Sequence, residues 1–305
     1  MKEFIKKILH LLLDPFFNIW FKINWKLFNK KNSNNDYKYY VSICAIFKDE
    51  GNYLKEWIEY YKLIGTDHIF LYNNFSTDNY KEILQKYIDN NFITFIDWPV
   101  QQGQLKAYRH CIENYSTISK WIGFFDIDEF FVSLNHKTLT EELQCYELYP
   151  SVVANWKTFG SSSITNRDLS IPVIKDFTKC QTDYYWGKYF INNSYTINYN
   201  YRRNKQFVHS IWIKVGFAYI PPITCNYKFY FGKYIDILNR PSNQKFWLNH
   251  YYTKSKSEFE IRINKTDVLY KKNNKNIQIL DKLDKKCVET DTTIQYYLPE
   301  LIKQL

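Results

Sequence analysis

The chain has 305 residues, 45% of them hydrophobic, which is enough for a sizeable core and excludes disorder over most of its length. Lysine and arginine outnumber aspartate and glutamate by 41 to 31. The resulting formal charge of +10 favours an anionic partner without choosing among nucleotides, nucleic acid and acidic lipid. The six cysteines form no CxxC pair and no zinc-ligand cluster, so we expect buried free thiols in a reducing compartment.

The N-terminal residues 1–31 mix lysine with large apolar side chains, and the polar run 30–36 is expected to be a linker. Charged residues, Asn and Pro interrupt the apolar positions too often for a membrane span, and a signal-peptide cleavage site is missing. Two alternatives remain for this basic amphipathic stretch. It either lies in a membrane interface, with Trp20, Phe21 and Trp25 at headgroup depth, or packs on the main domain through the same aromatics.

From residue 40, short apolar runs alternate with helical periodicity, which predicts an α/β fold with a mostly parallel sheet. The expected strands are 41–47, 69–72, 92–96 and 121–125, and the expected helices are 53–61, 78–90 and 103–115. Beyond residue 150 we expect mixed sheet and long loops, with strand-like runs at 184–201, 207–219 and 226–231 and helices at 255–270 and 288–304. The expected domain organisation is 1–36 as the N-terminal segment, 37–255 as the main domain and 256–305 as a helical extension packed on it.

Three carboxylates directly follow the fourth expected strand. In WIGFFDIDEFF, residues 121–131, they are Asp126, Asp128 and Glu129. Doubly wound sheets bind ligands at the carboxyl ends of their strands. Neighbouring carboxylates repel one another, whereas a hard divalent cation accepts two such oxygens and keeps positions for phosphate and water. The pattern therefore predicts a Mn²⁺ or Mg²⁺ site at Asp126 and Asp128 that stabilises a departing diphosphate, the alternative being a solvated acidic turn.

Seven further motifs follow one another along residues 40–300. They are KDE at 48–50, YLKEW at 53–57, NNFSTD at 73–78, QLKAYRHC at 104–111, WKTFGSS at 156–162, NHYYTKS at 249–255, and ETDTT with YLP at 289–299. Each is weak alone, but in this order they resemble the glycosyltransferases of family 2 and family 92 (DUF23-like). The sequence departs from the family at 184–245, where KQFVH at 205–209 only loosely matches the family's Lys-x-Ile-Val-x-Pro stretch and histidine.

The resemblance implies an inverting, metal-dependent GT-A glycosyltransferase with a Rossmann-like, mostly parallel sheet flanked by helices and a mixed acceptor-side half. Its expected substrates are a nucleotide-diphosphate sugar, a UDP-sugar above all, and a glycan or lipid-linked acceptor at the cytoplasmic membrane face. No nucleic-acid partner is expected. The implied nucleotide-sugar contacts are Lys48, Asp49, Glu50, Asn73, Asp126, Ile127, Asp128 and Lys254, and the implied metal ligands are Asp126, Asp128 and His250.

Several of these assignments keep an alternative. His250 is otherwise a structural histidine at a strand end, and Lys254 a solvated lysine. Inversion needs a carboxylate to take the proton of the acceptor hydroxyl, and spacing alone does not decide among four acids. They are Asp168, Asp176, Asp183 and Glu258. Three tryptophans of the later half suit stacking on sugar faces or packing in the core. They are Trp186, Trp212 and Trp247.

Two other functions remain open. The DID motif alone also allows metal-dependent nucleotidyl or phosphoryl transfer; a Walker loop, GxxxxGK[ST], is absent, but palm-type enzymes lack it as well. The positive charge allows a non-enzymatic protein that binds nucleic acid or a membrane surface, although the basic residues are dispersed along the chain.

Overall fold

The computed structural model describes residues 8, 12–23, 36–181, 186–195, 208–209, 211–215, 218–230, 244–264 and 276–305. An eight-stranded sheet with the order β3-β2-β1-β4-β8-β6-β11-β5 runs through the molecule. Its strands are β1 (Tyr39–Phe47), β2 (His68–Asn73), β3 (Ile93–Asp97), β4 (Ser119–Phe124), β5 (Glu129–Ser133), β6 (Ser151–Thr158), β8 (Gly187–Asn192) and β11 (Phe246–His250). Short strands form two pairs outside it: β9 (Ile213–Val215) with β10 (Ala218–Ile220), and β7 (Lys179–Cys180) with β12 (Glu289–Thr290).

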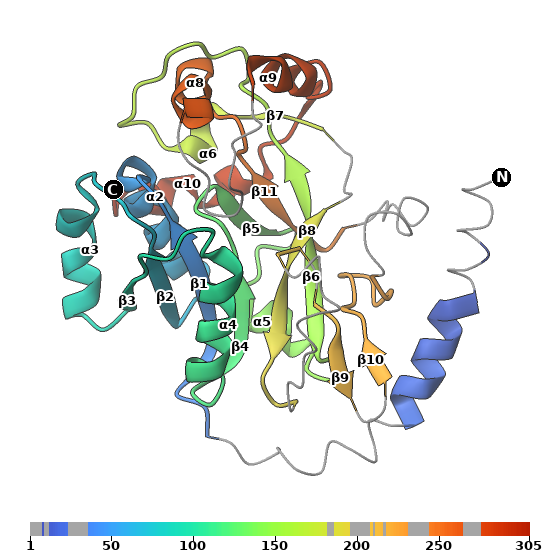
Figure 1. Cartoon of the computed structure of the whole chain (residues 1–305). Helices are drawn as coiled ribbons and strands as arrows, with labels where there is room; N and C mark the ends of the chain where they lie inside the picture. The colour runs from blue at the N-terminus through green and yellow to red at the C-terminus, as the bar shows by residue number, and fades with distance from the viewer. Residues whose placement is uncertain are drawn as a thin grey trace.

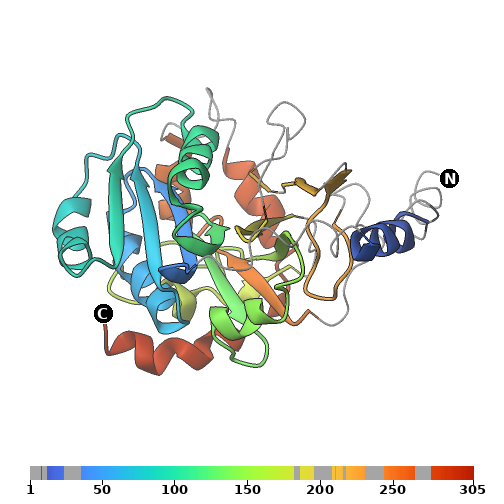
Figure 2. The same cartoon turned by 90° about the horizontal axis from the view of Figure 1, so that it is seen from below.

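Helices cover both faces of the sheet (Figures 1 and 2). They are α2 (Gly51–Leu63), α3 (Tyr80–Asp89), α4 (Gln104–Tyr115), α5 (Leu139–Gln144), α6 (Val173–Asp176), α8 (Lys256–Asn264), α9 (Ile277–Asp284) and α10 (Leu298–Ile302), with the 3₁₀ helix η2 (Thr293–Tyr297). Figure 2 shows α4 on one side of β1 to β3, and α2 with the C-terminal helix on the other.

The two halves of the sheet differ in strand direction. Strands β3, β2, β1 and β4 are all parallel neighbours. In the second half, β8 is antiparallel to both β4 and β6, β11 is parallel to β6, and β5 is antiparallel to β11. The expected α/β architecture, a mostly parallel sheet with a mixed second half, is therefore confirmed.

Each of the seven elements expected between residues 41 and 125 is present. Gly65 has a positive φ of 87° just after α2, a conformation that glycine adopts without a steric penalty. The predicted and observed elements agree here because the apolar side chains that set the sequence periodicity of each strand or helix are also the ones that are buried.

Agreement is poorer in the later half. Strands β8 and β9 fall within two of the expected runs, and β10 overlaps the end of the second. Residues 226–230 contain a turn, and Phe229 forms only an isolated bridge with Ile223. The helix expected at 288–304 was wrong at its start, because Glu289 and Thr290 pair with β7 as a strand. The expectation of buried cysteines was wrong at Cys145, which is exposed; the other five are buried, and all six are free thiols. The proposed domain boundaries stay predictions.

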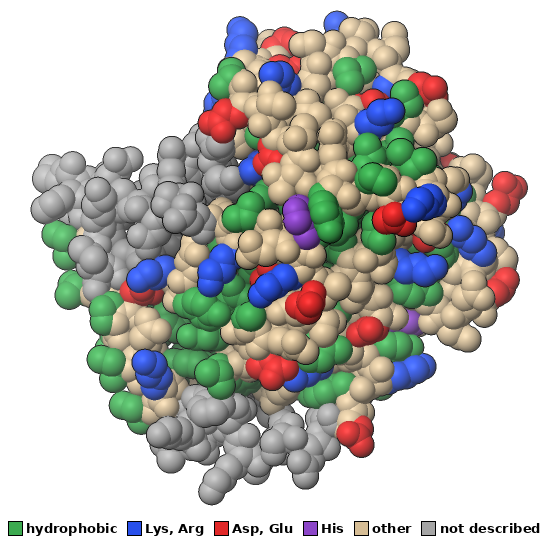
Figure 3. Space-filling view, turned by 180° about the vertical axis from the view of Figure 1, so that it is seen from behind, with side chains coloured by type: hydrophobic (Ala, Val, Ile, Leu, Met, Phe, Trp, Pro, Cys, Tyr) green, Lys and Arg blue, Asp and Glu red, His purple; other side chains and the backbone are tan. Residues whose placement is uncertain are grey.

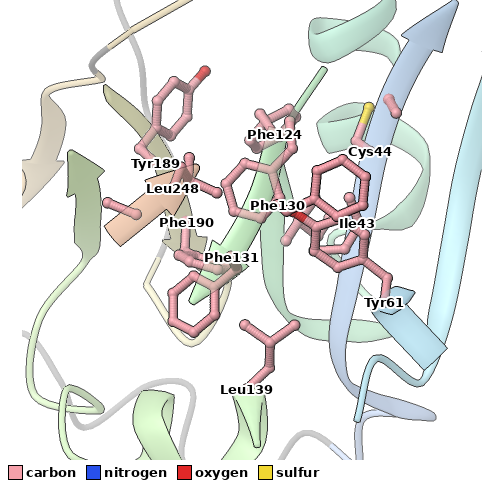
Figure 4. Close-up of a cluster of buried hydrophobic side chains, with 14 of the residues drawn as sticks. Ile43, Cys44, Tyr61, Phe124, Phe130, Phe131, Leu139, Tyr189, Phe190 and Leu248 are labelled. Carbon is pink, nitrogen blue, oxygen red and sulfur yellow. The ribbon is translucent and has the colours of Figure 1, made fainter. Parts of the chain in front are cut away.

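Aromatic side chains fill the space between the two halves of the sheet, where Figure 4 shows them. The ring of Phe190 on β8 lies 5.0 Å from that of Phe125 and 5.8 Å from that of Phe131 on β5. Gly123 on β4 makes room for Phe190, since a Cβ at this position would lie 2.7 Å from its ring. This packing fixes β4, and with it the acidic turn that follows the strand.

Helix α2 closes the edge of the sheet at β5. Nε1 of Trp57 and the hydroxyl of Tyr61 both donate to the carbonyl of Glu129 at 3.0 Å, and the hydroxyl of Tyr60 donates to the carbonyl of Phe131 at 2.6 Å. Strand β5 pairs with β11 along its other side. The aromatic residues of α2 thus bind the backbone that carries Glu129.

Residues 12–23 form a helix that packs on the domain, the second of the two expected arrangements. Phe21 is only 4% exposed and stacks on Tyr149, with ring centroids 5.2 Å apart. Asp14 accepts a hydrogen bond from the amide of Phe229 at 3.0 Å. Trp25 and residues 24–35 lie outside the described residues. Among the residues that are described, no helix combines the length and hydropathy that crossing a membrane requires.

Candidate active site

Three turns meet at one edge of the sheet because β1, β2 and β4 are parallel neighbours. They are residues 48–50, 73–74 and 126–128. Two of the expected nucleotide contacts bond to neighbouring elements. Asp49, with a φ of 51°, accepts from the amide of Thr77 in the loop after β2 at 2.7 Å, and Asn73 donates to Asp97 at the end of β3 at 2.9 Å. The side chain of Ile127 is buried, 2% exposed, so only its backbone is available to a ligand.

Asp126 is held by three donors. Its Oδ1 accepts from Nε2 of Gln104 at 2.8 Å and from the hydroxyl of Tyr108 at 3.2 Å, and its Oδ2 lies 2.8 Å from Nζ of Lys188. Lys188 is completely buried. Burial by itself would lower the pKa of Lys188, but Asp126 and Glu129 outweigh it and raise that pKa above its usual value. Asp126 is therefore paired with a fixed, charged ammonium.

Asp128 is buried beside two basic side chains, Arg262 and His250, from later parts of the chain. Nη1 of Arg262 lies 2.6 Å from its Oδ2, and Nε2 of His250 lies 3.6 Å from its Oδ1. Burial would raise the pKa of Asp128, but Arg262, His250 and Lys254 together hold it well below its usual range. The carboxylate is thus stabilised in its charged, ligating form.

Asp128, Glu129 and His250 form a set whose ligand atoms all lie within 4.8 Å of one another. The set arises from strand pairing, since Glu129 on β5 is the register partner of His250 on β11. Oε1 of Glu129 and Nδ1 of His250 are buried and, within the described part of the chain, lack a hydrogen-bond partner, although Nζ of Lys188 lies 4.0 Å from this oxygen of Glu129. Buried polar atoms of this kind are costly without a ligand, and two carboxylates with an imidazole suit Mn²⁺ or Mg²⁺. The residues present therefore fit a divalent cation.

The observed set differs from the expected one by one residue. It contains Asp128 and His250, adds Glu129, and leaves Asp126 with Lys188. Burial raises the pKa of Glu129 well above its usual value, an effect that a bound cation would oppose. Which of Asp126 and Glu129 ligates the cation stays a prediction to be tested.

Lys254 is buried beside the acidic residues rather than solvated. It is 5% exposed, has a φ of 54°, and places Nζ 4.0 Å from the ring centroid of Tyr53. Burial lowers its pKa, opposed by Glu50 and Asp128. At the end of β1, Nζ of Lys48 lies 5.9 Å from the ring centroid of Phe75.

The candidate bases have structural interactions of their own. Asp168 is exposed and accepts from the amide and hydroxyl of Ser170, and Asp176 is paired with Arg167 at 3.1 Å. Oε2 of Glu258 caps α8 by accepting from the amide of Ser255 at 3.0 Å. Asp183 lies outside the described residues. The base therefore stays unassigned among the four.

An aromatic cluster, defined here as Trp156, Trp186 and His209, adjoins His250. Ring centroids lie 4.2 Å apart for Trp156 and His250, 5.0 Å for Trp156 and His209, and 4.8 Å for Trp186 and His209. Burial and Lys188 lower the pKa of His209 to about 4, so its ring is neutral near pH 7. Nε1 of Trp156 and Nδ1 of His209 are further buried atoms for which the described residues supply no partner.

The other two expected tryptophans have packing roles. Trp247 is 4% exposed and donates to Asn249 at 2.8 Å, and Trp212 contacts Phe17 of the N-terminal helix. Sequence reasoning gave no site role to Lys188 or Arg262. A lysine within an apolar strand could have marked Lys188 as a candidate. Only the fold shows that Lys188 and Arg262 lie beside the acidic turn.

The sheet order, the acidic turn after β4 and the histidine at the end of β11 define a GT-A type protein. Residues 37–289 match the profile described as Glycosyltransferase family 92, so the chain belongs to that family.

Among its relatives, a glycosyltransferase family 92 protein of Ricinus communis is 36% identical over 92 residues, which cover 30% of this chain and 17% of the relative. Beta-1,4-galactosyltransferase galt-1 of Caenorhabditis elegans is 32% identical over 124 residues, 36% of this chain and 29% of the relative. The matched regions thus span less than a third of either relative.

Similar solved structures include S. aureus TarS, with 12% identity and a TM-score of 0.34 over 51% of this chain and 47% of that chain. Another is the mannosyltransferase PcManGT from Pyrobaculum calidifontis, in complex with GDP-Man and Mn²⁺. It shows 10% identity and a TM-score of 0.32 over 63% of this chain and 55% of that chain.

Proposed function

We propose that this protein transfers a sugar from a UDP-sugar to a glycan or lipid-linked acceptor, with inversion at the anomeric carbon and with Mn²⁺ or Mg²⁺ as cofactor. One observation carries the proposal: Asp128, Glu129 and His250 gather at the ends of β4 and β11, with Arg262 and Lys254 beside them. Family membership supports glycosyl transfer, and the galactosyltransferase relative supports a hexose as the transferred group.

The arrangement separates two tasks. The carboxylates and the imidazole would hold the cation, which would supply Lewis-acid stabilisation of the departing diphosphate. Arg262 and Lys254 would face the remaining negative charge of the diphosphate, since both already lie next to Asp128. Lys188, Gln104 and Tyr108 fix Asp126 in one orientation.

The aromatic cluster would contact the acceptor or the transferred sugar. Aromatic faces pack against the C–H groups of a pyranose ring, and Nε1 of Trp156 and Nδ1 of His209 would meet its hydroxyls. In the inverting step the acceptor oxygen forms a bond to the anomeric carbon, the bond to the diphosphate breaks, and the hydroxyl proton passes to one of the four candidate carboxylates.

Hydrolysis of UDP-glucose, UDP-galactose and UDP-N-acetylglucosamine by the purified chain tests this function. We expect Mn²⁺-dependent UDP release from one of them, abolished by EDTA. Turnover of ATP without UDP release would favour nucleotidyl or phosphoryl transfer. Tight, salt-dependent binding of DNA or RNA with weak UDP binding would favour the non-enzymatic alternative. Figure 3 weighs against that alternative on the face it shows, where basic and acidic side chains are interspersed.

A further inference from the structure

One face of the N-terminal helix leaves a row of large apolar side chains exposed. Leu12 is 67% exposed, Phe16 59%, Ile19 61% and Ile23 59%. At 3.6 residues per turn these four positions lie within about 60° of one another, so they form one stripe, called the outer face below. Single exposed apolar residues are ordinary, but a continuous stripe marks a surface that binds something.

The opposite face of the same helix is already occupied. Phe17 lies 5.7 Å from the ring of Phe229, Phe21 stacks on Tyr149, and Asp14 accepts from the backbone of Phe229. These contacts fix the rotation of the helix about its axis. The outer face therefore points away from the domain, at the side of the molecule opposite β3 and α3 (Figures 1 and 2).

Charge indicates what the outer face binds. Residues 1–31 contain seven lysines against two acidic residues, which is half of the net charge of the chain. One of the two acids, Asp14, is buried toward the domain, with Lys228 at 3.5 Å. Lys22 is exposed on the helix itself. Residues 1–31 therefore carry five more lysines than acidic residues, a positive charge that the segment does not itself neutralise.

We propose that the outer face inserts into the interface of an anionic lipid bilayer, while the inner face keeps the helix attached to the domain. Apolar side chains at the acyl boundary and lysines at anionic headgroups act together in such helices. A second copy of the chain is a poor occupant, because its outer face would bring the same positive charge. This assigns membrane contact to Leu12, Phe16, Ile19 and Ile23, and removes it from Phe21.

Sedimentation of the full chain with vesicles tests the proposal independently of glycosyl transfer. We expect binding to vesicles of phosphatidylcholine with 30% phosphatidylglycerol (about one anionic lipid in three), weaker binding in 0.5 M than in about 0.1 M NaCl, and little binding to phosphatidylcholine alone. The double variant Leu12→Ser, Ile19→Ser should lower the partition coefficient at least about tenfold.

The matched control is Val288→Ser, Ile302→Ser, which removes two side chains that are 73% and 51% exposed elsewhere. It should bind vesicles as the unmodified chain does. Thermal melting of both double variants establishes that they fold. Unchanged binding of the folded Leu12→Ser, Ile19→Ser protein would overturn the proposal. Equal binding to neutral vesicles, or a dimer in solution that this variant dissolves, would also overturn it.

Discussion

Arg262 and Asp128 are 134 residues apart in the chain, yet Nη1 of Arg262 lies 2.6 Å from Oδ2 of Asp128. This contact ties helix α8 to the acidic turn, and the same guanidinium nitrogen also donates to the carbonyl of Tyr252 at 2.9 Å. In the proposed reaction Asp128 would hold the divalent cation, so that the guanidinium of Arg262 would be available to the diphosphate.

The variant Arg262→Ala should weaken donor use and stability together. We expect kcat/KM for the UDP-sugar to fall at least about tenfold, and unfolding to become easier by about 1–3 kcal/mol because a buried carboxylate loses its partner. Mn²⁺ should raise the melting temperature of this variant more than that of the unmodified chain. Arg109→Ala, which removes an exposed pair with Glu113, is the control and should change neither property. Equal Mn²⁺ stabilisation of all three proteins would count against a shared role of Arg262 and the cation at Asp128.

Substitution of single carboxylates distinguishes the two possible ligand sets. Asp128→Asn should reduce turnover at least about a hundredfold while leaving the fold intact. Glu129→Gln should remove most of the Mn²⁺-dependent increase in melting temperature, and Asp126→Asn should remove less of it, because Asp126 is paired with Lys188. The reverse ranking would restore the set expected from the sequence, Asp126 with Asp128 and His250.

His68 makes the fold sensitive to acid. Burial lowers its pKa to about 4, from a usual value near 6.5, and the ring stacks on Tyr39 with centroids 4.4 Å apart. The unfolded chain therefore binds a proton at higher pH than the folded chain. Stability should be fully present above about pH 6.5 and should fall as the pH drops toward 4, by up to about 3 kcal/mol. Urea unfolding between pH 4 and 7 should show a shallower pH dependence for His68→Gln than for the unmodified chain; identical slopes would refute this.

Trp186→Ala tests the aromatic cluster. Loss of the indole should raise KM for the acceptor at least about fivefold, with little change in UDP binding measured by calorimetry, since stacking on a sugar ring is worth on the order of 1 kcal/mol. Trp212→Ala is the comparison, because Trp212 packs near the N-terminal helix. Equal effects of the two substitutions on KM would remove the cluster from substrate binding.

Phe21→Ala tests the attachment of the N-terminal helix. The substitution removes the stacking on Tyr149, so limited proteolysis should cleave within residues 1–31 at least about tenfold faster. Phe16→Ala changes the same residue type on the same helix, but at a side chain that is 59% exposed, and should leave the cleavage rate unchanged. If both variants are cleaved at the same rate, the helix is not held by its inner face.

The sequence predicted the parallel half well because one physical pattern governs it. Strand β1 is apolar at every position except Ser42, and helix α2 repeats apolar residues every three to four positions before Gly65. The acidic turn at Asp126 follows from the same pattern. The later half was harder to predict from the sequence. Glu289 and Thr290 are polar and exposed, and they form a strand only because they pair with β7. The paired residues Cys180 and Glu289 are 109 positions apart in the chain.

The sequence could point to the acidic turn because Asp126, Asp128 and Glu129 lie in one motif. The structure brings His250, from a second motif, beside Asp128, and the role of each as a ligand stays a prediction. The other neighbours of the turn depend on tertiary contacts. Lys188 reaches Asp126 because β8 runs antiparallel beside β4, and Glu129 meets His250 because β5 pairs with β11. Neither of these two contacts can be inferred from the spacing of the residues in the sequence.

The aromatic donors of α2 have a consequence for solubility. An open strand edge offers its carbonyl groups to any other chain, which is a common start of aggregation. On β5 the carbonyls of Glu129 and Phe131 are already taken by Trp57, Tyr61 and Tyr60. Side chains that position the acidic strand therefore also keep a neighbouring molecule from extending the sheet at that edge.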